Sequence, residues 1–280
     1  TAAGVALLRS PVVLEGEADG APFALAPVRR RPELRKSSET RARYRGEAAG
    51  GPLAASVVSE WEYDGTCKVE LTLTPAKGRA TARFDRLRLV VPFTAEGGVS
   101  YMANGENMRL SNQAGLIPKP GAPERLAGVA NWLPGAPESG AVWNSTSVRK
   151  QAMTVGSFVP FMWVGNLRGG LTWFADSDEG WWPTDKVPAI EIRRDGEGRA
   201  SLVLNLAGEA AELTGPRRIV FGLHVNPVRE PGEAKGSRLV FGYLKESGRW
   251  DGKTLPQAFA RRYPDNLELN RKYVGRCHQI

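Results

Sequence analysis

The feature that most constrains the fold is a two-residue alternation of apolar and polar side chains, which recurs in several runs. In residues 66–75 the odd-numbered positions from 67 to 73 are apolar, and the even-numbered positions are Lys, Glu or Thr. A β-strand turns successive side chains to opposite faces, so this run predicts a strand with one apolar and one polar face. One wetted face is typical of antiparallel sheets. We therefore expect a mainly antiparallel β protein.

Turn signals separate these runs. Asp64-Gly65 lies between the run 66–75 and a preceding run, 57–63, in which positions 57, 61 and 63 are apolar. Asp and Gly tolerate the positive φ of tight hairpin turns, so the two runs predict a β-hairpin. The same alternation predicts strands at 87–91, 202–206 and 219–225. The run 158–164 is apolar on both faces, which predicts a strand covered on both sides.

Composition limits the class of protein. No apolar run approaches the roughly 18–20 residues that cross a bilayer, so no membrane span is expected. The 8 Trp, 6 Tyr and 9 Phe supply enough apolar surface for a packed core. The expected fold is mainly β, a large two-sheet antiparallel β-sandwich (supersandwich-like) that occupies residues 1–250.

The last thirty residues have a different character. Thr254 and Gln257 stand at capping-box spacing ahead of one short helical segment, and Asp265 and Glu268 do the same for a second. The second segment keeps its apolar stripe up to the last residue. These two C-terminal helices are interpreted as the start of a truncated α/β barrel at 251–280.

Basic residues are concentrated near the N-terminus. The chain carries a formal net charge of +8, and residues 29–45 hold eight basic and two acidic side chains. Arg41, Arg43 and Arg45 alternate with Ala42 and Tyr44, so in a strand they share one cationic face. Such a face is either solvated or binds an anion. No nucleic-acid-binding motif accompanies it, so a nucleic-acid partner is not expected.

Few residues are available for metal or triad chemistry. The only cysteines, Cys67 and Cys277, are far apart and predicted to be buried thiols, and the only histidines are His224 and His278. A histidine-based zinc site or a Ser/His/Asp triad is therefore not expected. No cofactor, no metal and no catalytic residue are assigned to this chain.

The densest cluster of aromatic and polar residues spans positions 161–182. It predicts a strand, a Gly-rich hairpin, a second strand with Trp163 and Trp173 in the core, and an acidic loop. Aromatic rings beside carboxylates suit sugars, because C–H faces stack on the rings and carboxylates accept from hydroxyls. The predicted substrate-binding residues are Trp181, Trp182, Asp176 and Asp178. The acids at 176–179 could instead hold calcium, although their spacing is not that of an EF-hand.

Several stretches together resemble a known family. The stretches are residues 62–65, 69–75, 87–92, 142–145, 163–181 and 219–228. They resemble, in order, the β-sandwich region of the glycoside hydrolase family 123-like proteins of bacteria, over roughly residues 55–280. The resemblance implies a β-sandwich that precedes a (β/α)₈-type barrel, in proteins that release N-acetylgalactosamine by substrate-assisted hydrolysis. It also implies that the catalytic Asp-Glu pair lies in the barrel, beyond this chain.

The expected function follows from this resemblance. The chain would be the non-catalytic β-sandwich portion of a glycoside hydrolase-like protein, supporting the barrel domain of the same protein and lining a glycan cleft. Its expected partners are a carbohydrate and that barrel. The alternative is a self-standing carbohydrate-binding module, with acidic glycans favoured by Arg41, Arg43 and Arg45; a structural domain that binds nothing is a third hypothesis. The expected location is secreted or periplasmic, with the signal peptide absent from this chain.

Overall fold

The computed structural model of the chain describes residues 6–104, 112–117, 140–147, 157–184 and 186–226. These residues form a mainly β fold, as predicted. All of these residues belong to one compact unit, Thr1–Arg229. The predicted C-terminal helices, the boundary at residue 250 and Cys277 lie outside the described residues.

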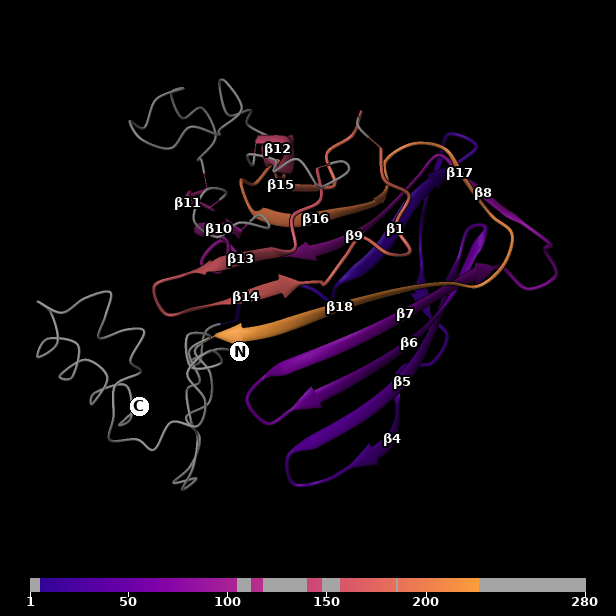
Figure 1. Ribbon diagram of the computed structural model, residues 1–280, viewed down its shortest axis with the longest axis horizontal. Coiled ribbons are helices and arrows are strands. Elements are labelled where there is room, and N and C mark those ends of the chain that lie inside the picture. The colour runs from indigo at the N-terminus through magenta and orange to yellow at the C-terminus, as the bar shows by residue number, and fades with distance from the viewer. Residues whose placement is uncertain (1–5, 105–111, 118–139, 148–156, 185, 227–280) are drawn as a thin grey trace, which may run out of the picture. The chain divides into compact units, whose positions relative to one another are not determined.

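Two antiparallel sheets make up most of the described chain (Figure 1). The large sheet has ten strands, and its path across the described residues is β11 (Asn112–Leu116), β10 (Ser100–Asn104), β13 (Phe161–Asn166), β14 (Gly169–Phe174), β18 (Arg217–Asn226), β7 (Thr66–Pro75), β6 (Leu53–Glu62), β5 (Arg41–Gly50) and β3 (Ala26–Pro27), with β4 (Glu33–Ser37) also paired to β5. The small sheet has six described strands in the order β12 (Gly140–Asn144), β15 (Ile190–Arg194), β16 (Ala200–Ala207), β9 (Arg86–Pro92), β1 (Val13–Ala18) and β2 (Ala21–Ala24). A separate ribbon pairs β8 (Ala82–Phe84) with β17 (Ala211–Leu213), and a single 3₁₀ turn covers Ser145–Ser147.

The predicted strands and the predicted hairpin are confirmed. β6 and β7 pair antiparallel around Asp64-Gly65, and Gly65 has a φ of 93°. A residue with a side chain rarely adopts such a φ, which is why glycine is placed there. The alternating runs at 87–91, 202–206 and 219–225 form β9, β16 and β18.

The two sheets bury their facing side chains in one cluster, which is the core of a β-sandwich. The cluster combines β9 and β16 of the small sheet with β7, β14 and β18 of the large sheet, and Trp143 and Trp173 are fully buried in it. Trp163 is half-buried on the opposite face of the large sheet, so of the two tryptophans predicted to be core only Trp173 is in it. Burial raises the pKa of the Cys67 thiol to about 12, as expected for the predicted buried thiol.

Two details of the predicted strands differ from the structure. The strand expected from residue 158 begins only at Phe161, because Pro160 has no N–H to give to the sheet and Phe158 packs against Trp173 and Trp181 instead. The alternation in residues 57–63 places Trp61 on the apolar face of its strand, but its side chain is 40% exposed near the tip of the hairpin.

Candidate functional site

The acidic loop predicted to bind sugar connects the two sheets. β13 and β14 form the predicted Gly-rich hairpin, in which the Asn166 side-chain oxygen accepts from the N–H groups of Arg168 and Gly169 at 2.7 and 3.1 Å. The chain then leaves β14, and the N–H of Trp182 donates to the Leu206 carbonyl of β16 at 2.7 Å. The loop is thus anchored to the large sheet at one end and to the small sheet at the other.

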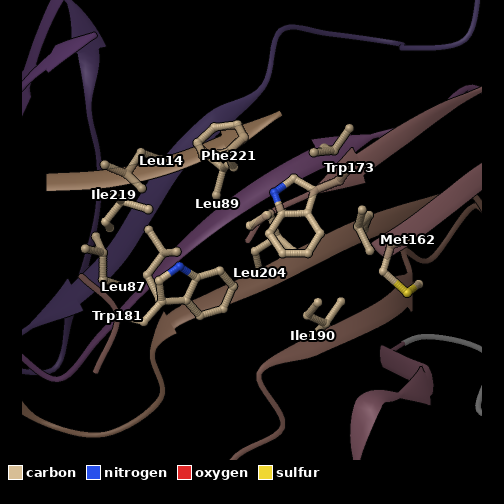
Figure 2. Packing of buried hydrophobic residues seen from close by; sticks show 14 of the residues in the cluster. Leu14, Leu87, Leu89, Met162, Trp173, Trp181, Ile190, Leu204, Ile219 and Phe221 are labelled. Carbon is tan, nitrogen blue, oxygen red and sulfur yellow. The ribbon is translucent and has the colours of Figure 1, made fainter. Parts of the chain in front are cut away.

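Trp181 is part of the core. Its side chain is 4% exposed and meets Phe158 edge to face, with ring centroids 5.4 Å apart, and Trp173 at 6.0 Å. Figure 2 shows it in the core cluster with Leu87 of the small sheet and Ile219 of the large sheet. The ring is covered by protein on its faces, so it offers no free surface on which a sugar could stack.

Trp182 is half-buried and packs against other parts of the protein. It meets Phe84 of the β8–β17 ribbon edge to face at 5.4 Å, and the Arg217 guanidinium lies 3.9 Å from its ring centroid. A cation over an aromatic face is a favourable contact that occupies that face. Both tryptophans therefore anchor the loop in the structure described here.

Arg217 fixes the backbone of this loop. Its Nε donates to the Gly180 carbonyl at 2.7 Å, and its Nη2 donates to the Trp181 carbonyl at 2.8 Å. Burial lowers the pKa of Arg217. Gly180 has a φ of +87°, and a Cβ there would lie 2.1 Å from the Arg218 carbonyl oxygen. The loop conformation therefore depends on a guanidinium clamp and on the absence of a side chain at Gly180.

The four predicted binding residues do not share one site. Asp178, Trp181 and Trp182 line a narrow space of about 10 Å³, which has room for one water molecule and not for a sugar. Asp176 is exposed and faces a different and much larger hollow. Binding of a carbohydrate by these residues stays a prediction, and Asp176 is the member placed where a ligand could reach it.

The larger hollow has a volume of about 500 Å³ and lies on the face of the large sheet that points away from the core. We call it the outer hollow. Strands β7, β14 and β18 form its floor, and the exposed acids Asp176 and Glu179 stand at its edge. Its volume lies within the range of small-ligand sites.

The floor of the outer hollow is built from one cross-strand row. Phe174, Gly222 and Lys68 are paired in register across β14, β18 and β7. The Phe174 ring lies over Gly222, because a Cβ placed there would be 2.1 Å from the Phe174 Cζ. Phe174 remains half-buried, so part of its ring faces the hollow. Only a glycine at position 222 permits this placement of the ring.

Charged side chains lie beside this row. Glu70 accepts from Lys68 Nζ at 3.2 Å and from Arg218 Nη2 at 3.1 Å. Partial burial alone would raise the pKa of Glu70, but the hydrogen bonds from Arg218 and Lys68 outweigh it and hold the pKa below its ordinary value. The lining of the outer hollow therefore combines an anchored pair of cations, Lys68 and Arg218, with the acids Asp176 and Glu179.

Sequence reasoning missed most of the outer hollow. Phe174 lies within the aromatic cluster at positions 161–182, but Lys68 and Arg218 come from strands more than a hundred residues apart in the sequence. In the sequence, Lys68 is a polar residue of the predicted strand 66–75, and Arg218 directly precedes the predicted strand 219–225. Which strands are neighbours is set by the sheet order, and no local pattern records it.

The predicted cationic face on β5 is present, and acidic side chains oppose it. Arg41 contacts Glu60 at 3.6 Å and Glu62 at 3.0 Å, both on the neighbouring strand β6. Arg43 stands directly opposite Glu60 in the register. These are exposed pairs, each worth about 1 kcal/mol or less. Much of the face expected to bind acidic glycans is thus locally balanced by Glu60 and Glu62.

The described residues contain neither a metal-binding cluster nor a membrane-spanning helix. The described part of the chain contains no group of three or more His, Cys, Asp and Glu side chains placed to hold a metal ion. Within that same part, no helix has both the length and the apolar character required to span a bilayer.

Comparison with known proteins adds little. No protein-family model matches the chain, and no curated protein does. A solved structure that it is similar to is a crystal structure of an Escherichia coli K12 protein provisionally described as an aldose 1-epimerase. The two are 13% identical over 79% of this chain and 80% of the other, with a TM-score of 0.33. At that level the likeness carries no argument about function.

Proposed function

We propose that this chain is the non-catalytic, carbohydrate-binding β-sandwich of a glycoside hydrolase-like protein related to family 123, and that the outer hollow is its sugar site. The observation that carries the proposal is that one hollow of about 500 Å³ is lined by an aromatic ring, two acids and two cations: Phe174, Asp176, Glu179, Lys68 and Arg218.

The chemistry of the outer hollow suits a sugar. Carboxylates accept hydrogen bonds from hydroxyls, and Lys and Arg donate to ring and acetamide oxygens. The exposed part of the Phe174 ring gives an apolar surface for the C–H face of a pyranose. Pockets that combine a few fixed polar groups with an apolar face are typical of small-ligand sites.

The proposal assigns binding, and no proton transfer, to the two acids. The carboxylates of a glycoside hydrolase flank the scissile bond within a site that excludes bulk water. Asp176 and Glu179 are both exposed to solvent. Catalysis is accordingly placed outside this chain, in the barrel that the sequence resemblance implies.

Isothermal titration calorimetry tests the proposal. The ligands are N-acetylgalactosamine and N-acetylglucosamine oligosaccharides, and chromogenic glycosides of the same sugars are assayed for hydrolysis in parallel. A hydrogen bond to a charged group contributes about 1.5–3 kcal/mol, so Asp176→Asn is expected to weaken binding by about tenfold or more. Glu39→Gln, which changes an exposed acid outside the outer hollow, is the matched control and should bind normally.

Three results would contradict the proposal. One is that none of these sugars binds the wild-type chain. Another is that Asp176→Asn and Glu179→Gln bind as well as the control. Hydrolysis by this chain would contradict the assignment of catalysis to a separate barrel.

A further inference from the structure

The edge of the large sheet beside β5 carries a bulge made mostly of arginine. The Val28 N–H donates to the Glu47 carbonyl of β5 at 2.8 Å, and the chain pairs with β5 again where Glu33 stands opposite Arg45. Residues 29–32, Arg-Arg-Arg-Pro, therefore stand opposite a single residue of β5. Extra residues in an edge strand cannot stay in the plane of the sheet, so this segment must leave it.

The bulge overhangs a second hollow, of about 520 Å³, which we call the arginine hollow. Pro32 Cβ lies 3.8 Å from where a Cβ of Gly46 would be, so the bulge folds over the face of β5 to which Gly46 points. Tyr44 and Val57 form part of the floor. By strand alternation this is the core-facing side of the large sheet, opposite to the outer hollow.

The floor is open because the small sheet does not cover it. Tyr44 and Val57 are half-buried, whereas Leu53 and Leu73, further along the same face of β6 and β7, are fully buried. In Figure 1, β4, β5 and β6 extend beyond the strands of the small sheet. An aromatic and apolar floor thus remains accessible beneath the arginines.

The charges that line the arginine hollow are not balanced. Two arginines of its lining have acidic partners: Arg35 contacts Glu33 at 2.9 Å, and Arg45 contacts Glu47 at 3.5 Å on the opposite face of β5 from Tyr44. The other three, Arg29–Arg31, are exposed and have no ion pair with any described residue. Arg41 differs, because Glu60 and Glu62 of β6 balance its charge. The lining of the arginine hollow therefore carries an excess of three positive charges.

We propose that the arginine hollow binds an acidic oligosaccharide through its carboxylate or sulfate groups. A guanidinium offers two parallel N–H donors that match the oxygens of both groups. The Tyr44 ring and Val57 supply an apolar floor for a pyranose ring. A nucleic acid strand is less suited, because it needs a cationic track with repeated stacking rings, and this site is a single hollow with one aromatic ring. The site is independent of the outer hollow, and neither proposal rests on the other.

Binding assays with two matched variants test this inference. The probes are a heparin hexasaccharide (sulfated), a polygalacturonate hexasaccharide (carboxylated), uncharged chitohexaose and a single-stranded DNA 12-mer. The site variant replaces Arg29, Arg30 and Arg31 with Gln. The control variant removes three positive charges from exposed ion pairs outside the arginine hollow, at Arg41, Arg83 and Lys186. Both variants lower the net charge from +8 to +5.

The site variant is expected to lose at least tenfold in affinity for one or both acidic hexasaccharides, while the control loses less than threefold. Which acidic hexasaccharide binds tighter identifies the group that is recognised. Equal losses in both variants would overturn the inference, because binding would then follow net charge alone. Absence of binding to both acidic probes, or equal binding of chitohexaose or DNA, would overturn it as well. Asp176→Asn should leave this binding unchanged, so failure of one proposed site is distinguishable from failure of the other.

Discussion

Replacing Trp181 by alanine is expected to remove about 3–5 kcal/mol from the free energy of unfolding. An indole side chain buries about 150–250 Å², which at about 25 cal/mol per Å² amounts to roughly 4–6 kcal/mol of transfer free energy. Trp181 is only 4% exposed and packs on Phe158 and Trp173, so nearly all of this area is lost in the variant. Alanine keeps the β-carbon and the unfolded chain already buries part of the indole, so the expected loss is about 3–5 kcal/mol, the usual range for Trp→Ala in a core.

Urea unfolding followed by circular dichroism measures this loss, and Trp61→Ala is the control. Trp61 is the same residue type on the same protein but is 40% exposed, and its substitution is expected to cost about 1 kcal/mol or less. For an m-value of about 3 kcal/mol per molar urea, the midpoint of Trp181→Ala falls by about 1 M or more. A loss for Trp181→Ala no larger than that for Trp61→Ala would refute the assignment of Trp181 to the core.

Two further predictions concern the backbone at Gly180 and the carboxylate of Glu70. Gly180→Ala is expected to cost at least 1 kcal/mol more than Gly20→Ala in thermal or urea unfolding, because both have positive φ but only Gly180 meets a carbonyl; equal costs would contradict the clash. The pKa of Glu70 is lower in the folded chain than in the unfolded chain, so its contribution to stability is present above the unfolded pKa and lost as the pH falls through the folded pKa. Glu70→Gln should therefore lose less stability than the wild type as the pH falls below about 4.5, the ordinary pKa of this carboxyl. Urea unfolding between pH 3 and 7 measures this, and an unchanged decrease in the free energy of unfolding at low pH would count against it.

Alternation in the sequence predicted the strands well, because it is a local property. Most residues of β7 and β18 indicate their face by their polarity, and Asp64-Gly65 indicates the turn between β6 and β7. The same reasoning placed Trp173 in the core. The prediction for Trp61 was wrong, because its side chain is 40% exposed and burial also depends on how far the opposite sheet extends.

The candidate site was predicted less completely. The aromatic and acidic composition of the loop drew attention to Asp176, but it could not separate Asp176 from Asp178 and Trp181. Those residues are neighbours in the sequence and face different spaces, because Arg217 and Gly180 fix the path of the loop between the sheets.

The sequence alone therefore determined the class of fold, the strands and the cationic stretch, since these depend on side-chain type and on a period of two. The tertiary structure decided which faces are covered and which charges meet. Strand order places Lys68 and Phe174 on either side of Gly222 in one cross-strand row. The bulge at residues 29–32 leaves three arginines without acidic partners among the described residues, while Glu60 and Glu62 of β6 balance Arg41. Such contacts join residues far apart in the chain, so they follow from how the whole sheet assembles and not from any local run of residues.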